Sequence, residues 1–157
     1  MTGYTRATQI KDIPVVADTM RPEDVAEVRA QSGSTPRQAL LYCYFKSKPC
    51  MSMVSRHGNV IGMWGVVPVD DMTGRIWMLG AQAMLDDMND RRTFLKRSKE
   101  ILEELHAVYP VLFNHVDARN KVHIRWLQWM GFTFIQDHPN YGAEGRQFFE
   151  FCRMSHV

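Results

Sequence analysis

Cysteine is scarce in this chain, and its spacing fits neither common structural use of thiols. The three cysteines are Cys43, Cys50 and Cys152, and no C-x-x-C pair occurs among them. An odd number without close pairing predicts neither a disulfide framework nor a thiolate zinc site. The six histidines contain no H-x-x-x-H pair. We therefore expect no metal site from the sequence.

Long apolar segments are also missing. The first residues lack the apolar stretch of a signal peptide. The longest mostly apolar run, from Val60 to Val69, is too short to span a bilayer and contains glycine and proline. These absences predict a soluble, intracellular protein with reduced thiols and no membrane segment.

Neither sign of charge dominates the composition. The 19 Lys and Arg residues nearly balance the 17 Asp and Glu residues, which leaves a formal net charge of +2. Proteins that wrap nucleic acid carry a much larger basic excess. The basic cluster between Arg91 and Lys99 is followed by glutamates that dilute it, so nucleic acid is the least favoured partner.

The length and the hydrophobic content predict a single domain over residues 1–157. Hydrophobic residues make up 45% of the 157 positions, which is enough for a core without covalent cross-links. The hydrophobic period changes from helical to alternating and back along the chain, and glycines and prolines mark the boundaries. The expected elements are a strand at 7–10, helices at 22–33 and 36–45, strands at 51–55, 59–69 and 75–81, a helix at 90–109, a strand at 111–117, a helix at 121–130, and strands at 132–136 and 146–154. This order predicts an α/β (α+β) fold with a mixed, mostly antiparallel sheet.

The segment from Asn120 to Phe132 carries the most specific pattern. It reads N-K-V-H-I-R-W-L-Q-W-M-G-F. It resembles, in register, the pattern N-x-x-A-x-x-F-Y-x-x-x-G-F of GCN5-related N-acetyltransferases (GNAT). Asn120 is expected to cap the helix, and Gly131 to allow the left-handed turn that ends it. The resemblance implies a GNAT-like sheet of about six to seven strands, flanked by about four helices and splayed near the end of strand 75–81.

Further segments resemble the internal virion protein A family of short-tailed (podovirus) phages. The matching residues are Val116, Asn120, His123 to Leu127, Gly131 and Gly145 to Phe151. The segments Gly65 to Pro68 and Ile76 to Gly80 also resemble the phage acetyltransferase-like group. This resemblance implies a phage protein whose partners are other virion or internal core proteins. It also implies a location in the host cytoplasm during infection, with the virion as a further location.

The GNAT resemblance implies an acyl-CoA site, yet the corresponding segment has an unusual composition. GNAT enzymes bind the pyrophosphate with a glycine-rich loop, R-x-x-G-x-G/A, at a helix N-terminus. Residues 83–92 contain no glycine and carry three aspartates, whose charge repels phosphate. Arg91 and Arg92 would offset this charge, or would simply form a solvated helix start. The other candidate cofactor-binding residues are Leu79, Gly80 and Ala81, through backbone pairing with pantetheine, and Asn120.

The usual catalytic tyrosine is also missing. The GNAT residue that returns a proton to the thiolate corresponds to Leu127, which cannot transfer one. Weak catalytic candidates are His115 and Asp117, which share one face of a strand, although Asp117 also fits a turn residue. His123 is either a base or a hydrogen-bonded core histidine. Tyr141, in a nearby loop, is the last candidate.

Two functions fit these observations. The first is a GNAT-fold internal virion protein that acts in virion assembly and keeps only a degenerate acyl-CoA site. The alternative is an acyl-CoA-dependent N-acetyltransferase, with acetyl-CoA as cofactor and catalysis by proximity. The missing glycines and tyrosine favour the first function. Binding of acetyl-CoA would distinguish the two.

Overall fold

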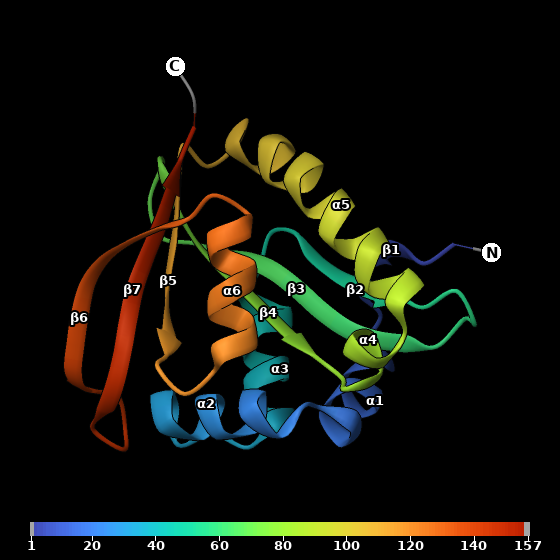
Figure 1. Cartoon of the computed structure of the whole chain (residues 1–157), viewed down its shortest axis with the longest axis horizontal. Helices are drawn as coiled ribbons and strands as arrows, with labels where there is room; N and C mark the ends of the chain where they lie inside the picture. Colours follow the sequence, from blue (N-terminus) through green and yellow to red (C-terminus); the bar gives the residue numbers. More distant parts are fainter. Residues whose placement is uncertain (1, 156–157) are drawn as a thin grey trace.

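The computed structural model describes residues 2–155 and contains a seven-stranded sheet in the order β1-β2-β3-β4-β5-β7-β6 (Figure 1). Its strands are β1 (Tyr4–Ala7), β2 (Cys50–Val54), β3 (Val60–Pro68), β4 (Thr73–Gly80), β5 (Val111–Asp117), β6 (Thr133–Tyr141) and β7 (Arg146–Met154). Neighbouring strands are antiparallel except for the parallel pair β4–β5. The expected mixed, mostly antiparallel α/β fold is therefore confirmed.

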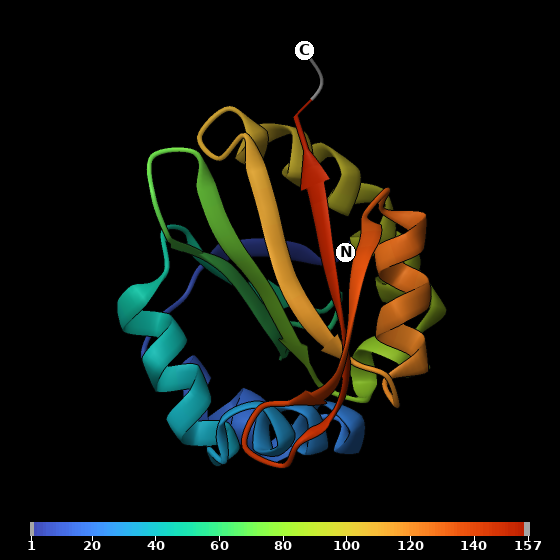
Figure 2. The ribbon, with the colours of Figure 1, turned by 90° about the vertical axis from the view of Figure 1, so that its left-hand side faces the viewer.

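Helices cover both faces of the sheet (Figure 2). They are α1 (Asp12–Thr19), α2 (Pro22–Ser32), α3 (Pro36–Lys46), α4 (Ala83–Asp86), α5 (Met88–His106) and α6 (Lys121–Trp129). Four of them correspond to the expected helices, and the short helices α1 and α4 are additional. Leu102 of α5 and Leu127 of α6 pack in one core cluster, whereas α1, α2 and α3 share a second cluster with Met63 and Leu79. Within residues 2–155, no helix combines the length and the apolar character that crossing a bilayer requires.

The local signals for helix ends act largely as expected. Thr35 and Gln38 form a capping box at the start of α3. Gly131 has φ +89°, and the N–H of Phe132 donates to the carbonyl of Leu127 at 3.0 Å. This bond closes the turn after α6 and places Phe132 against Leu127 in the core.

Two strands differ from the expectation for identifiable reasons. The first strand lies at residues 4–7 instead of 7–10, because the Asp12 carboxylate accepts a hydrogen bond from the N–H of Gln9 and begins a helix there. The strand expected at 132–136 continues to Tyr141. Pro139 is tolerated because β6 is an edge strand, where an absent N–H costs no ladder bond.

The central strands β4 and β5 separate after a short contact. They pair only from Thr73–Val111 to Arg75–Phe113. The side chain of Asn114 then donates to the carbonyl of Ile76 at 2.6 Å, just beyond the last backbone pair. The expected splay is therefore present, and it opens a gap in the middle of the sheet.

Candidate functional site

A cavity of about 860 Å³ occupies the gap between β4 and β5. Its walls come from both faces of the sheet, with Val28 and Trp77 on the side of α1–α3 and Leu102 and Leu127 on the side of α5 and α6. Most of the lining is apolar. The polar side chains among the lining residues include Glu27, Asn114, His115, His123 and Tyr141. Three of the four weak catalytic candidates thus line one cavity, whereas Asp117 does not.

Four buried polar residues, Arg21, Asp24, Glu27 and Asn120, connect α2 to the end of β4 and the start of α6. We call them the α2 network. Arg21 Nη1 lies 3.2 Å from Asp24 Oδ1, and Asn120 Nδ2 donates to the same oxygen at 3.0 Å. Arg21 Nη2 donates to Asn120 Oδ1 at 3.3 Å. All four residues are less than 10% exposed. Their polar groups are therefore stabilised by hydrogen bonds and ion pairs with one another and not by water.

The α2 network uses backbone groups that were expected to bind pantetheine. The N–H of Gly80 donates to Asp24 Oδ2 at 3.0 Å, and its carbonyl accepts from the N–H of Arg21 at 2.9 Å. The N–H of Ala81 donates to the carbonyl of Ile61 at 2.8 Å. Leu79 is one of the residues that line the cavity, and it pairs with Met63 of β3. The last residues of β4 are therefore paired within the chain.

Asn120 does not cap α6 with its side chain as the sequence pattern suggested. It precedes the helix, but its side chain makes no capping hydrogen bond. The amide is instead directed into the α2 network, where Asp24 and Glu27 accept from it at 3.0 and 3.5 Å. The Asn120 Oδ1 that would accept from the helix N–H groups instead accepts from the charged Arg21 guanidinium at 3.3 Å, and a charged donor forms the stronger bond.

Glu27 is the most strongly perturbed acid of the α2 network. Burial raises the pKa of its carboxyl to about 8, and the negative charge of Asp24 acts in the same direction. The carboxyl accepts a hydrogen bond from the N–H of Asp117 at 2.8 Å, which opposes the rise only in part. Glu27 is consequently a neutral acid through most of the physiological range.

His123 lies in the cavity wall on α6. Burial lowers the pKa of its imidazole, an effect that Asp24 opposes and Arg21 reinforces. Within residues 2–155 its ring has no hydrogen-bond partner. It is therefore a neutral ring facing the cavity, and not the hydrogen-bonded core histidine considered above.

Asp117 ends β5 and holds the turn that follows. Its carboxylate accepts from the backbone N–H of Arg119 at 2.9 Å and from the Arg119 guanidinium at 2.7 Å. Burial raises the pKa of Asp117, but the bonds from Arg119 outweigh it and leave the pKa lowered. The carboxylate is thus committed to Arg119, and the structure does not bring it to His115.

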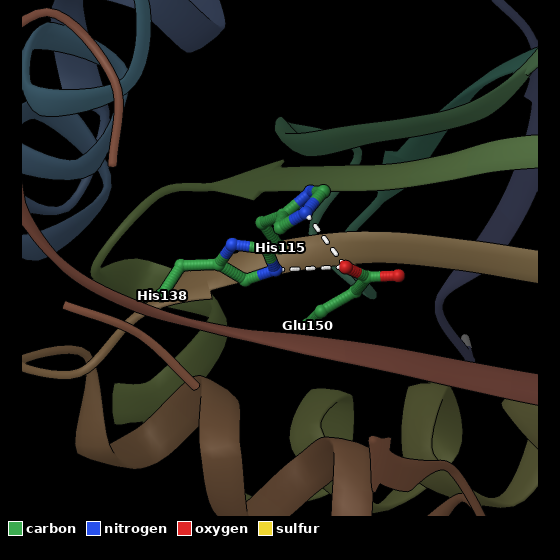
Figure 3. A group of neighbouring side chains, drawn as sticks. All are labelled: His115, His138 and Glu150. Atoms are coloured by element: carbon green, nitrogen blue, oxygen red, sulfur yellow. Dashed lines mark hydrogen bonds and ion pairs between the residues drawn. The ribbon is translucent and has the colours of Figure 1, made fainter. Parts of the chain in front are cut away.

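His115 belongs instead to a group of side chains from three strands (Figure 3). Its Nε2 lies 3.3 Å from Glu150 Oε1, and His138 Nε2 lies 2.8 Å from the same oxygen. The Tyr141 ring stacks on His115 with centroids 4.4 Å apart, and its hydroxyl lies 3.2 Å from His115 Nδ1. We call His115, His138 and Glu150 the His–His–Glu cluster.

His138 and Glu150 were not among the candidates that the sequence indicated. His138 and Glu150 are 23 and 35 residues away from His115, so no short motif contains them. The signal lies in the sheet register, because Glu150 is the direct partner of His115 across β5 and β7. Recognising the cluster therefore requires the strand order, which local pattern does not supply.

The N-terminus of α5 already holds an anion from its own chain. Asp87 Oδ1 accepts from the N–H groups of Asn89 and Asp90 at 2.9 and 3.0 Å. Its other oxygen accepts from Arg56 Nε at 3.0 Å. The bond from Asp90, with that from Arg56, lowers the pKa of Asp87, so the carboxylate stays charged. The backbone donors that a phosphate would need are occupied here.

Arg91 and Arg92 lie close to the N-terminus of α5. Arg91 is partly buried and Arg92 is exposed. Neither forms an ion pair with another residue in the part of the chain that the structure describes. They are the cations available for an incoming anion at this end of α5.

Solved structures of similar shape define the class of the fold. Ard1 from Thermoplasma volcanium superposes with a TM-score of 0.73 and 17% identity, covering 100% of both chains. A GNAT-family acetyltransferase from Bacillus anthracis gives 0.71 and 9% identity over 98% of this chain and 95% of that one. The ribosomal-protein-S18-alanine N-acetyltransferase of Escherichia coli gives 0.70 and 16% over 99% and 96%. The protein therefore has the GNAT fold.

A family match is more specific. Residues 53–139 match the family described as bacteriophage T7, probable scaffold protein Gp13, and the chain belongs to this family. No curated protein sequence matches the chain. The chain is thus a phage-family protein built on the GNAT fold, which confirms both resemblances noted in the sequence.

Proposed function

We propose that this protein acts in virion assembly and does not use an acyl-CoA cofactor. The observation that carries the proposal is the Asp87 carboxylate at the N-terminus of α5, with both oxygens engaged. A pyrophosphate would have to displace a charged carboxylate from the two backbone N–H groups. The residues present do not fit that group, because like charges repel and no glycine permits a closer approach.

The end of β4 supports the same conclusion. Pantetheine pairing needs free backbone groups along this strand, but Gly80 and Ala81 are bonded within the chain. Leu127, which corresponds to the GNAT tyrosine, is buried in the core and supplies no proton. The cofactor site is thus degenerate at three separate positions, while the fold itself is kept.

The family description makes other virion or internal core proteins the natural partners. Helix α3 offers a surface of the right character, since it exposes the apolar side chains of Leu41, Tyr42 and Phe45. Phe45 is 71% exposed, and a group of large exposed apolar residues is typical of a surface that another protein covers. Assembly would take place in the host cytoplasm during infection, with the virion as a further location.

The alternative function is an acyl-CoA-dependent N-acetyltransferase. It is favoured by the cavity between β4 and β5, which is lined by His115, His123 and Tyr141. In this case Arg91 and Arg92 would hold the pyrophosphate, because both lie close to the N-terminus of α5 and neither is in an ion pair within residues 2–155.

A complementation experiment distinguishes these functions. A phage that lacks the gene for this chain is expected to give few complete particles, and the chain supplied from a plasmid is expected to restore them. The double variant Arg91→Ala/Arg92→Ala should restore particles as well as Lys96→Ala, an exposed position of the same helix. Mass spectra of the virion proteins should show the same acetyl groups with and without the chain.

Two results would contradict the assembly function. One is a normal particle yield without the chain. The other is failure of Arg91→Ala/Arg92→Ala to complement, together with loss of an acetyl group from a virion protein, which would establish the transferase.

A further inference from the structure

The His–His–Glu cluster has the composition of a transition-metal site. It offers two imidazole nitrogens and one carboxylate oxygen, and all three ligand atoms lie within 4.8 Å of one another. Two histidines and one carboxylate are a donor set that zinc and other first-row divalent ions prefer. The three side chains come from β5, β6 and β7 and converge on one point (Figure 3).

We propose that His115, His138 and Glu150 bind one divalent transition-metal ion, with Zn²⁺ as the representative ion. Tetrahedral zinc with bonds of about 2.0–2.1 Å places its ligand atoms about 3.3 Å apart. His115 Nε2 and Glu150 Oε1 are 3.3 Å apart, and His138 Nε2 is 2.8 Å from that oxygen. Lengthening the shorter of these two distances by about half an ångström would bring both to that spacing, and all three ligand atoms already lie within 4.8 Å of one another.

A second layer of contacts orients the ligands. The Tyr141 hydroxyl lies 3.2 Å from His115 Nδ1, so that nitrogen can donate its proton to the tyrosine and leave Nε2 free to bind metal. The Tyr141 ring stacks on the imidazole and restricts its rotation. His115 has a side chain only 9% exposed, whereas Glu150 and His138 are 23% and 26% exposed. The site is therefore held firmly on one side and open to entry of an ion on the other.

The charge balance also suits a cation. Without metal, two imidazoles share one carboxylate oxygen, so Glu150 is the one anionic group within the cluster. The positive charge of Arg75 acts on His115 and opposes a second cation, and Glu150 offsets this charge. A bound ion would replace the protons between the two Nε2 atoms and Glu150, each imidazole keeping at most the proton on its Nδ1, and would satisfy all three ligand atoms together.

The position of the site suggests what a bound ion does. β6 is the edge strand, and its register shifts between His138 and Tyr141. A metal joined to His138, Glu150 and His115 would fasten this irregular edge to β7 and β5. Three protein ligands leave a coordination position for water or a small ligand, and His115 also lines the central cavity.

The test is titration of the chelator-treated protein with Zn²⁺ in a calorimeter. One ion per chain is expected, and His138→Ala and Glu150→Gln should each weaken binding by at least tenfold. His57→Ala is the matched control, because His57 is an exposed histidine outside the cluster, and binding should not change. Glu150→Gln keeps the size of the side chain, and circular dichroism without metal should show that both variants are folded.

Substitution with Co²⁺ identifies the ligand type. The spectrum of the bound ion should lack a thiolate charge-transfer band, since the three cysteines lie outside the cluster. The proposal is overturned if the wild-type protein binds no Zn²⁺. It is equally overturned if folded His138→Ala and Glu150→Gln bind as tightly as the wild type, or if a thiolate band appears.

Discussion

Arg21→Met is expected to lower the free energy of unfolding by about 3–5 kcal/mol. Arg21 neutralises Asp24 and donates to Asn120 inside the α2 network, and its side chain is 4% exposed. Methionine fills similar space but leaves the Asp24 charge buried without its cation. Removing one partner of a buried ion pair lowers the stability strongly, because the remaining charge stays buried without compensation. Replacing both partners with well-packed apolar residues costs much less. Urea denaturation at neutral pH measures the change.

The matched control is Arg37→Met, which removes a guanidinium of the same kind from the surface. Arg37 lies 3.0 Å from Asp18, but the two side chains are 59% and 63% exposed. Solvent screens such a pair, so the expected loss is below about 1 kcal/mol. Equal losses in the two variants would show that the α2 network is not a buried electrostatic unit.

Glu27→Gln is expected to remove most of the loss of stability that the protein shows as pH rises. Burial and the Asp24 charge raise the pKa of Glu27 from 4.5 to about 8 in the folded protein. Between these values the folded state keeps a proton that the unfolded state releases. The stabilisation from this carboxyl is complete below about pH 4.5 and is lost as the pH rises through about 8.

The size of the effect follows from this shift. Near pH 9 the variant should be more stable than the wild type by about 2–5 kcal/mol, whereas near pH 5 the two should be similar. His123 has the opposite effect in the acidic range. Its pKa in the folded protein is lowered from the ordinary value of 6.5, so the protein loses stability as the pH falls below 6.5. Urea denaturation at a series of pH values tests both effects.

Glu104→Gln serves as the control, since Glu104 is an exposed carboxylate on α5. Its stability curve should run parallel to that of the wild type. A Glu27→Gln variant that still loses stability between pH 5 and 9 to the same extent would contradict the assignment of Glu27 as a buried neutral acid.

Much of the fold could be predicted because residues close to each helix end determine where that helix begins or ends. Pro22, the capping box at Thr35 and Gly131 each begin or end a helix for reasons of backbone geometry. Nearly continuous apolar runs bounded by turn residues likewise predicted β3 and β4. The bounds of the edge strands β1 and β6 differ from the prediction, because each pairs with one neighbouring strand only. Contacts such as the hydrogen bond from Gln9 to Asp12 determine where β1 lies.

The candidate site was only partly visible in the sequence. His115, His123 and Tyr141 were singled out, and all three line the cavity. The residues that contact His115 were not singled out, because the contact with Glu150 depends on the register between β5 and β7. The α2 network was missed for the same reason, since Asp24 and Asn120 are 96 residues apart. Contacts between distant segments follow from topology and not from local pattern.

We propose that Asp87 and the α2 network close the cofactor site of this GNAT fold. Calorimetric titration with acetyl-CoA at low ionic strength tests it most directly, since weak charge-driven binding is strongest there. No saturable binding is expected up to millimolar concentration. Micromolar affinity that is weakened by Arg91→Ala or Arg92→Ala, but not by Lys96→Ala, would contradict it.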